Sequence, residues 1–173
     1  MRLVLVLISL VTFASVQAAY EPFEPDVIKV INTAATNVNT AVQTEFNNFN
    51  TTAVFNTDAD VFTSVTTNGV VCVPGLYLVD IVLYHVAPST AQRSNPSVEV
   101  TVDSVSTGIR GANGYVRRSG SHNEGTTTVA DLVQLTTTSK IGFDTFRLTE
   151  FSTGNVSAPV GQSAMRIVRI DDI

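Results

Sequence analysis

The sequence of 173 residues contains no tryptophan, one cysteine and two lysines, and only 14% of its residues are charged. A single cysteine excludes a framework of internal disulfides, so a packed core must stabilise the fold. The formal net charge of −5 argues against a phosphate-binding surface, because nucleic-acid affinity depends largely on clustered Lys and Arg. We therefore expect one globular domain with no nucleic-acid partner.

Long hydrophobic runs are also missing. The mostly apolar stretch from Leu3 to Phe13 has eleven residues, whereas a helix that spans a bilayer needs about 20. Arg2 precedes this stretch and small residues follow it up to Ala18, which is the pattern of a cleaved secretory signal peptide. We expect residues 1–18 to be removed, the mature protein to be secreted and extracellular, and no membrane span to remain.

Valine and threonine dominate the composition, with 27 and 23 residues. Both are β-branched and favour strands. From Thr51 onward apolar and polar residues alternate, and clusters of Gly, Pro, Asn and Ser divide the chain into short segments. We predict strands near residues 60–65, 69–73, 76–86, 97–103, 114–118, 126–136, 141–150 and 164–170. This pattern indicates an all-β sandwich of two sheets over residues 51–173.

Residues 26–49 show a different period. Apolar residues recur there at intervals of three and four, which predicts a helix with one apolar stripe made of Ile28, Ile31, Ala35, Val38, Val42 and Phe49. Asparagine and threonine lower the helix propensity, so identical neighbours in a coiled coil would best stabilise such a helix. We expect residues 19–50 to form an oligomerising helical stalk. The alternative is an amphipathic helix that lies on its own domain.

The predicted strand from Leu76 to Val86 is apolar on both faces. One face carries Tyr77, Val79, Ile81 and Leu83, and the other carries Leu76, Leu78, Val82, Tyr84 and Val86. An antiparallel sandwich buries only one face of each sheet in its core. Because no helix is expected in this domain, another copy of the chain is the expected cover, which predicts a homo-oligomer with closed symmetry.

Three segments resemble C1q-like and tumour-necrosis-factor-like (TNF-like) domains, in the form seen in microbial and viral C1q-like modules. They are Asn68 to Tyr77, where a Pro-containing turn leads into Gly-x-Tyr, then Leu132 to Leu135, and Ser163 to Ile170. The resemblance implies a two-sheet jelly roll that forms a homotrimer through the sheet that carries the Gly-x-Tyr strand. It also implies that Tyr77 lies in the trimer interface, followed by Val79, Ile81 and Leu83.

Few residues point to catalysis or metal binding. The only histidines are His85 and His122, and neither belongs to a catalytic or zinc-binding motif. His85 lies in an apolar strand and is interpreted as structural. Calcium, which some C1q-like heads hold, has no binding motif in any loop of this sequence. We therefore expect no enzyme activity, no catalytic residue, no metal site and no cofactor.

Other residues are candidates for contacts and modification. Cys72 is flanked by valines and is expected to be a buried free thiol, with a bridge between subunits as the alternative. Two sequons predict glycosylation at Asn50 and Asn155 if the host glycosylates. The candidate ligand-binding loops contain Arg110, Arg117, Arg118, His122 and Glu124, although charges that only solvate strand ends are the alternative.

Together these features predict a secreted homotrimeric recognition or adhesion protein that binds a protein or glycan ligand through exposed loops. The alternative is a structural component of an extracellular coat, matrix or fibre. Three weak sites on one rigid trimer would gain avidity, whereas a structural component would pack into a larger assembly.

Overall fold

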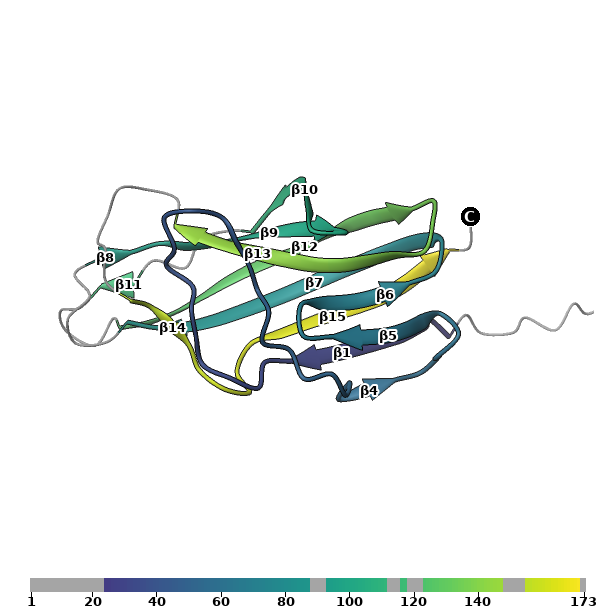
Figure 1. The fold of residues 1–173 in the computed structure, drawn as a ribbon, viewed down its shortest axis with the longest axis horizontal. Coiled ribbons are helices and arrows are strands. Elements are labelled where there is room, and N and C mark those ends of the chain that lie inside the picture. The colour runs from purple at the N-terminus through teal and green to yellow at the C-terminus, as the bar shows by residue number, and fades with distance from the viewer. Residues whose placement is uncertain (1–23, 88–92, 112–115, 118–122, 148–154, 172–173) are drawn as a thin grey trace, which may run out of the picture.

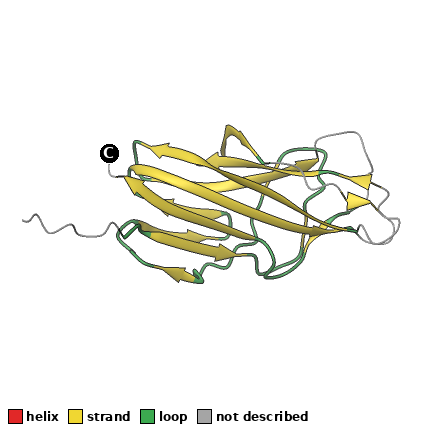
Figure 2. Ribbon diagram, turned by 180° about the vertical axis from the view of Figure 1, so that it is seen from behind, coloured by secondary structure: helices red, strands yellow, loops and turns green. Residues whose placement is uncertain are grey.

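The computed structural model describes residues 24–87, 93–111, 116–117, 123–147 and 155–171. These residues form antiparallel strands in two layers, and no helix occurs among them (Figures 1 and 2). The predicted all-β sandwich is therefore confirmed. The strands run roughly along the long axis of the molecule, so each layer presents one face to the core and one face outward (Figure 1).

The first layer, called the β7 sheet, has seven strands in the described part of the chain. Its order is β2 (Thr36–Asn37), β14 (Ser157–Ala158), β7 (Gly75–Val86), β15 (Ala164–Asp171), β1 (Val27–Ile31) and β4 (Phe55–Asn56), and β12 (Glu124–Leu135) pairs with β7. β15 and β14 pair with one side of β7, and β12 pairs with its other side along the whole length of β7. β12 is therefore an edge strand, at the opposite end of the sheet from β4.

The second layer, called the β13 sheet, has six strands among the described residues. Its order is β10 (Val105–Arg110), β9 (Pro96–Val102), β13 (Ser139–Arg147), β6 (Gly69–Cys72) and β5 (Phe62–Thr66), and β3 (Thr44–Glu45) pairs with β13. Two short strands, β8 (Arg93–Ser94) and β11 (Val116–Arg117), pair with each other at one end of the sandwich (Figure 1).

Most predicted strands correspond to observed ones, namely β5, β6, β7, β9, β12, β13 and β15, whereas the predicted strand at 114–118 is described only at β11. Strand β10 was not predicted, because Ser106, Thr107 and Gly108 break the apolar alternation. It follows a two-residue turn in which Asp103 and Ser104 have φ values of 50° and 65°. Left-handed residues at both central positions match the twist of a tight hairpin, so this turn pairs β10 with β9.

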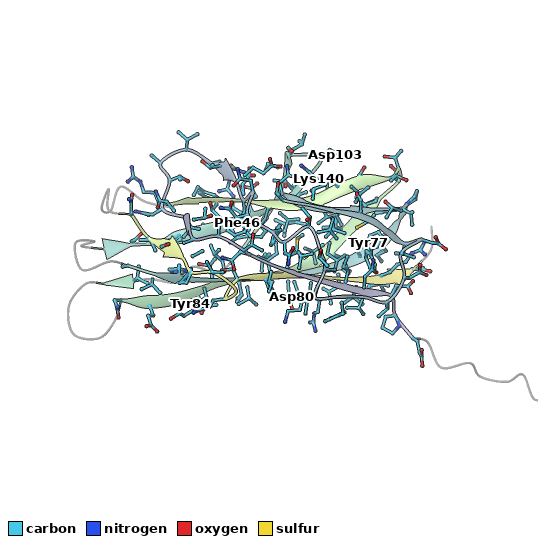
Figure 3. All side chains as sticks on the ribbon, turned by 60° about the horizontal axis from the view of Figure 1, so that its bottom comes forward. Phe46, Tyr77, Asp80, Tyr84, Asp103 and Lys140 are labelled. Carbon is cyan, nitrogen blue, oxygen red and sulfur yellow. The ribbon has the colours of Figure 1, made fainter. Side chains whose placement is uncertain are left out.

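Alternating side chains from the two sheets meet in one core. Val98 and Val100 of β9 and Phe143 of β13 are fully buried, and Phe46 stacks on Phe143 with ring centroids 4.7 Å apart. Figure 3 shows Phe46 and Tyr77 between the two layers. Burying each side chain of this size stabilises the fold by about 1.5–3 kcal/mol, and this burial replaces the missing disulfides.

The position of Tyr77, Val79, Ile81 and Leu83 corrects a prediction. All four have 0% exposure within a single chain, so they belong to the core between the sheets. Side chains that one chain already buries completely have no surface left for a neighbouring copy, and their assignment to a trimer interface is wrong. The alternation along β7 was predicted correctly, but the face that points outward is the other one.

The N-terminal helix is a second correction. Residues 27–31 form β1, which pairs with β15 on one side and with β4 on the other. Ile28 and Val30, two residues apart, are both fully buried, which is the period of a strand. The Asn32 amide donates to the carbonyl oxygens of Ala34 and Pro159, so asparagine here orders irregular backbone. Residues 27–50 are part of the sandwich, and the expected division at residue 50 does not separate a stalk from a domain.

The single cysteine lies in the core. Cys72 is a free thiol with 0% exposure, and burial raises its pKa to about 12. A thiol of this kind stays protonated at neutral pH and has no access to a second chain. The expectation of a buried free thiol is confirmed, and the alternative of a bridge between subunits is not compatible with the fold.

Candidate interaction surface

The outward face of β7 carries large apolar or aromatic side chains at every position except Asp80. Leu78 lies between Leu132 of β12 and Val168 of β15, and Val82 lies beside Ala164. Leu132 is 51% exposed and Val82 is 36% exposed, although both are large hydrophobic residues. We call this surface the outer face. Its side chains are Leu76, Leu78, Asp80, Val82, Tyr84 and Val86 of β7, Glu124, Thr126, Thr128, Ala130, Leu132 and Gln134 of β12, Ala164, Arg166 and Val168 of β15, and Val27, Lys29 and Ile31 of β1.

The polar groups of the outer face lie mainly along the edge strand β12, and on the neighbouring strands the charges of Asp80 and Arg166 neutralise each other. Arg166 donates a hydrogen bond to Asp80 at 2.9 Å, and both side chains are partly exposed. Near the end of β7, a hydrogen bond with Glu124 raises the pKa of Tyr84, because the nearby carboxylate disfavours a phenolate. Figure 3 shows Asp80 and Tyr84 on the outer side of one layer, with Asp103 and Lys140 on the opposite side of the molecule.

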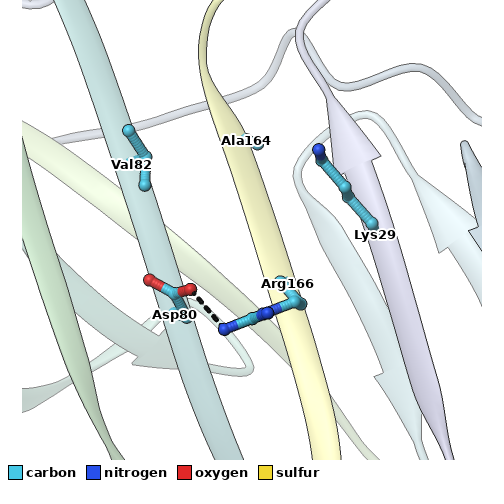
Figure 4. Close-up of a pocket in the computed structure, with 5 residues that line it drawn as sticks. All are labelled: Lys29, Asp80, Val82, Ala164 and Arg166. Carbon is cyan, nitrogen blue, oxygen red and sulfur yellow. Dashed lines mark hydrogen bonds and ion pairs between the residues drawn. The ribbon is translucent and has the colours of Figure 1, made fainter.

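A shallow hollow of about 150 Å³ lies in the middle of the outer face. It is lined by Lys29, Asp80, Val82, Ala164 and Arg166 (Figure 4). Ala164, which pairs with Ile31 of β1 and Val82 of β7, contributes the shortest side chain of this lining. Asp80 and Arg166 point toward each other, whereas Lys29 extends along the neighbouring strand without joining them. Such a hollow can receive one side chain from another molecule, but it is too small to enclose a larger ligand.

The predicted ligand-loop residues are not brought together where the structure describes them. The guanidinium of Arg110 pairs with Glu99 at 3.0 Å and lies 5.2 Å from the centre of the Phe146 ring, on the outward side of the β13 sheet. Glu124 belongs to the other layer, where it contacts Tyr84. Arg117 lies in β11 opposite Arg93. Arg118 and His122 lie outside the described residues.

The two predicted glycosylation sites lie in loops. Asn155 is exposed just before β14, and its side-chain oxygen accepts a hydrogen bond from the Asn37 amide at 3.3 Å. Asn50 is half-buried, and its side-chain oxygen accepts from the backbone N–H of Thr52 at 3.0 Å. Both side-chain nitrogens belong to accessible loops, and glycosylation at these positions stays a prediction.

His85 is built into the packing. It has 0% exposure, and its Nδ1 lies 3.2 Å from the carbonyl oxygen of Leu83. Gly125 on β12 is needed here, because a Cβ atom at that position would lie 2.9 Å from Nε2 of His85. The close approach of β12 to this ring is therefore a packing feature. Among the described residues, no group of three or more His, Cys, Asp and Glu is placed to hold a metal ion.

A row of three carboxylates crosses the outward side of the β13 sheet, and the sequence did not reveal it. Asp144 of β13 lies opposite Glu99 of β9 and opposite Glu45 of β3. Burial and the charges of Glu45 and Glu99 raise the pKa of Asp144, although Gln43 and Lys140 act in the opposite direction. Burial would also raise the pKa of Glu99, but hydrogen bonds from neighbours that include Ser106 and Arg110 lower it on balance. Only strand pairing brings these distant residues together.

The raised pKa of Asp144 leads to a prediction for the variant Asp144→Asn. A carboxyl whose pKa is higher in the folded chain gains stability as the pH falls through that pKa, and lacks this gain at pH 7. Asparagine removes the repulsion and can still accept the 2.9 Å hydrogen bond from Gln43. We expect the free energy of unfolding at pH 7 to rise by about 0.2–1 kcal/mol, with a smaller difference from the wild type toward acid pH.

Urea denaturation of both proteins between neutral and acid pH measures this difference. Asp60→Asn is the control, because Asp60 is exposed and lies in the segment before β5, away from the carboxylate row. A variant Asp144→Asn that is less stable than the wild type at pH 7 would contradict the prediction, since it would show that the carboxylate is net stabilising.

Comparison with solved structures agrees with this architecture. Murine APRIL at pH 5.0 superposes with a TM-score of 0.51 at 12% identity, covering 85% of this chain and 100% of that chain. A structure of Eiger TNF from S. frugiperda gives a TM-score of 0.50 at 12% identity, with 87% and 96% covered. The chain has a C1q/TNF-like jelly-roll fold. The globular domain of zebrafish complement 1qA protein also matches, with 13% identity, a TM-score of 0.46, and 84% and 97% covered.

The jelly-roll fold is thus established by structural comparison, because the sequence comparisons found no similar protein. The sequence matches no protein-family model, and no curated protein is similar to it in sequence. No helix in the described part of this jelly roll is long and apolar enough to cross a membrane. Sequence reasoning found both apolar faces of this strand but chose the wrong one as the exposed face, although one signal for the right choice was present. Asp80 lies on the Leu78 side of β7, whereas the Tyr77 side carries no charged residue, and a charged residue marks the face that points outward.

Proposed function

We propose that this protein is a secreted, non-enzymatic recognition or adhesion module. In this proposal three copies assemble through their outer faces and bind an extracellular protein or glycan ligand through exposed loops. The observation that supports it best is the outer face itself. An antiparallel sheet usually carries polar side chains on the face that points to water, whereas this one carries Leu78, Leu132 and Val168 side by side.

The shape of the outer face favours a cyclic assembly. The twelve residues of β7 extend for about 40 Å, and the side chains that point outward from Leu76 to Val86 are apolar or aromatic except for Asp80. A symmetry axis parallel to β7 would bury this whole stripe, whereas an axis across the strands would bury only part of it. Cyclic symmetry around such an axis also closes the assembly and leaves no apolar face exposed.

The same arrangement gives the assembly a binding end. An axis parallel to the strands places the three copies of the β8–β11 ribbon at one end, opposite the C-terminal end of the described chain (Figure 1). Three weak sites on one rigid body increase the overall affinity through effective concentration. The predicted signal peptide at residues 1–18 adds that the protein works outside the cell.

The native mass of the secreted protein tests the proposal. We expect a discrete trimer without a disulfide between subunits at micromolar concentration, and specific binding when this trimer is applied to an array of glycans and cell-surface proteins. A stable monomer would overturn the assembly. Filaments or sheets that grow with concentration would instead support the structural alternative of a coat, matrix or fibre component.

A further inference from the structure

Lys29 lies on the β1 side of the hollow in the outer face and has no ion-pair partner among the described residues. Strand pairing places Ala130, Asp80, Arg166 and Lys29 in one row across β12, β7, β15 and β1. The only ion pair in this row joins Arg166 to Asp80 at 2.9 Å. Within the part of the chain that the structure describes, the Lys29 ammonium forms no ion pair or hydrogen bond. The row therefore carries one excess positive charge beside the hollow.

This charge matters when a second copy covers the outer face. An ammonium group that loses its water without gaining a counter-ion strongly destabilises the interface that buries it. Asp80 does not neutralise it, because its carboxylate already pairs with Arg166. An assembly that buries this row therefore needs an anion from the neighbouring copy.

Symmetry limits which carboxylate can supply that anion. A rotation about an axis parallel to the strands leaves every residue at its own height along the axis. In a ring of three, one lateral side of each copy, including its sheet edge, meets one neighbour, and the other lateral side meets the next. Lys29 lies on the β1 side, so its partner must lie on the β12 side at about the same height.

Asp131 meets this requirement. It lies on the edge strand β12, next to Ala130, which shares the row of Lys29. Asp131 is exposed, although alternation along β12 would direct it inward with Val129 and Val133. One carboxylate oxygen accepts the backbone N–H of Leu132 at 2.8 Å, and the side chain forms no ion pair with another described residue. An exposed carboxylate at the sheet edge is free to meet a neighbouring face.

We propose that Lys29 of one copy forms an ion pair with Asp131 of the next copy, in the hollow over Ala164. This inference rests on the proposed trimer and identifies the charges that set its register. The hollow of about 150 Å³ has room for one carboxylate side chain, and its lining carries the two cations Lys29 and Arg166 against the single carboxylate of Asp80. Apolar contacts alone would allow neighbouring copies to slide past each other along β7. One ion pair per interface fixes the position of each copy along the symmetry axis.

Charge reversal in the full-length protein tests the pair. The variants are Lys29→Asp, Asp131→Lys and the double variant, with Asp60→Lys as a control of equal charge change away from the outer face. Sedimentation measures the concentration at which half of each protein is assembled. We expect each single reversal to raise this concentration at least about tenfold, and the double variant to return to within about threefold of the wild type.

Each result decides between the pair and its alternatives. Thermal melting of each variant confirms that the monomer is folded. A wild-type trimer whose double variant is no better than the single ones overturns the ion pair and leaves the trimer standing. A wild-type monomer overturns both proposals. If only Lys29→Asp weakens assembly, and added phosphate strengthens the wild-type trimer, the hollow holds a solute anion and the Asp131 pairing is wrong.

Discussion

Replacement of Leu132 by aspartate is expected to convert the assembled protein into folded monomers. Leu132 is 51% exposed on β12, so the single chain does not depend on it for core packing. In the proposed trimer its side chain is buried beside Leu78, and a carboxylate there would be desolvated without a partner. A penalty of about 3 kcal/mol or more per interface would raise the assembly concentration more than a hundredfold.

Sedimentation velocity measures the change in mass, and far-ultraviolet circular dichroism confirms the β fold. Val160→Asp is the matched control, because Val160 is 57% exposed in the turn before β15 and lies outside the outer face. This control should remain assembled. A fully assembled Leu132→Asp variant would show that the outer face is not the interface, even if the protein is a trimer.

Replacement of Ile81 by aspartate is expected to prevent folding. Ile81 has 0% exposure and points into the core from the centre of β7. The substitution removes a large apolar side chain and places a carboxylate where no cation is available, which costs about 5 kcal/mol or more. Because domains of this size are stable by only about 5–15 kcal/mol, most of the folded population should be lost.

The adjacent variant Val82→Asp is the matched comparison. Val82 follows Ile81 in the same strand but points outward, and it is 36% exposed. We expect Val82→Asp to give a folded chain that fails to assemble and Ile81→Asp to give an unfolded or insoluble one. Circular dichroism and urea denaturation distinguish the two. If Ile81→Asp unfolded cooperatively with the free energy of unfolding of the wild type, the assignment of this side chain to the core would be refuted.

Local sequence signals predicted the strands well and the N-terminal segment poorly. Strands β7, β9 and β15 were found because their residues alternate and their ends carry turn-forming residues. The helix expected at 26–49 failed because apolar residues spaced by three and four also occur by chance in irregular chain. Phe46 and Phe49 are fully buried at positions between short strands, where tertiary contacts, not a helical period, determine burial.

The sites also divide into those that local sequence signals reveal and those that only strand pairing brings together. Asn50, Asn155 and Cys72 could be named from motifs or neighbours in the sequence, since these signals are local. The carboxylate row of Glu45, Glu99 and Asp144, and the row that joins Lys29 to Arg166, each combine strands far apart in the chain. No spacing in one sequence records such a pairing, because the register is set by the contacts of the folded sheets.

The sequence by itself determined that residues 51–173 form an all-β sandwich with a core that needs no disulfide, and that β7 carries apolar side chains on both faces. Residue type and alternation are local properties, so both conclusions could be reached without coordinates. Only the tertiary structure decided which face of β7 is the core, that β1 belongs to the sheet, and which charges lie in one row across it. These depend on how the two sheets pack, and packing depends on the whole chain at once.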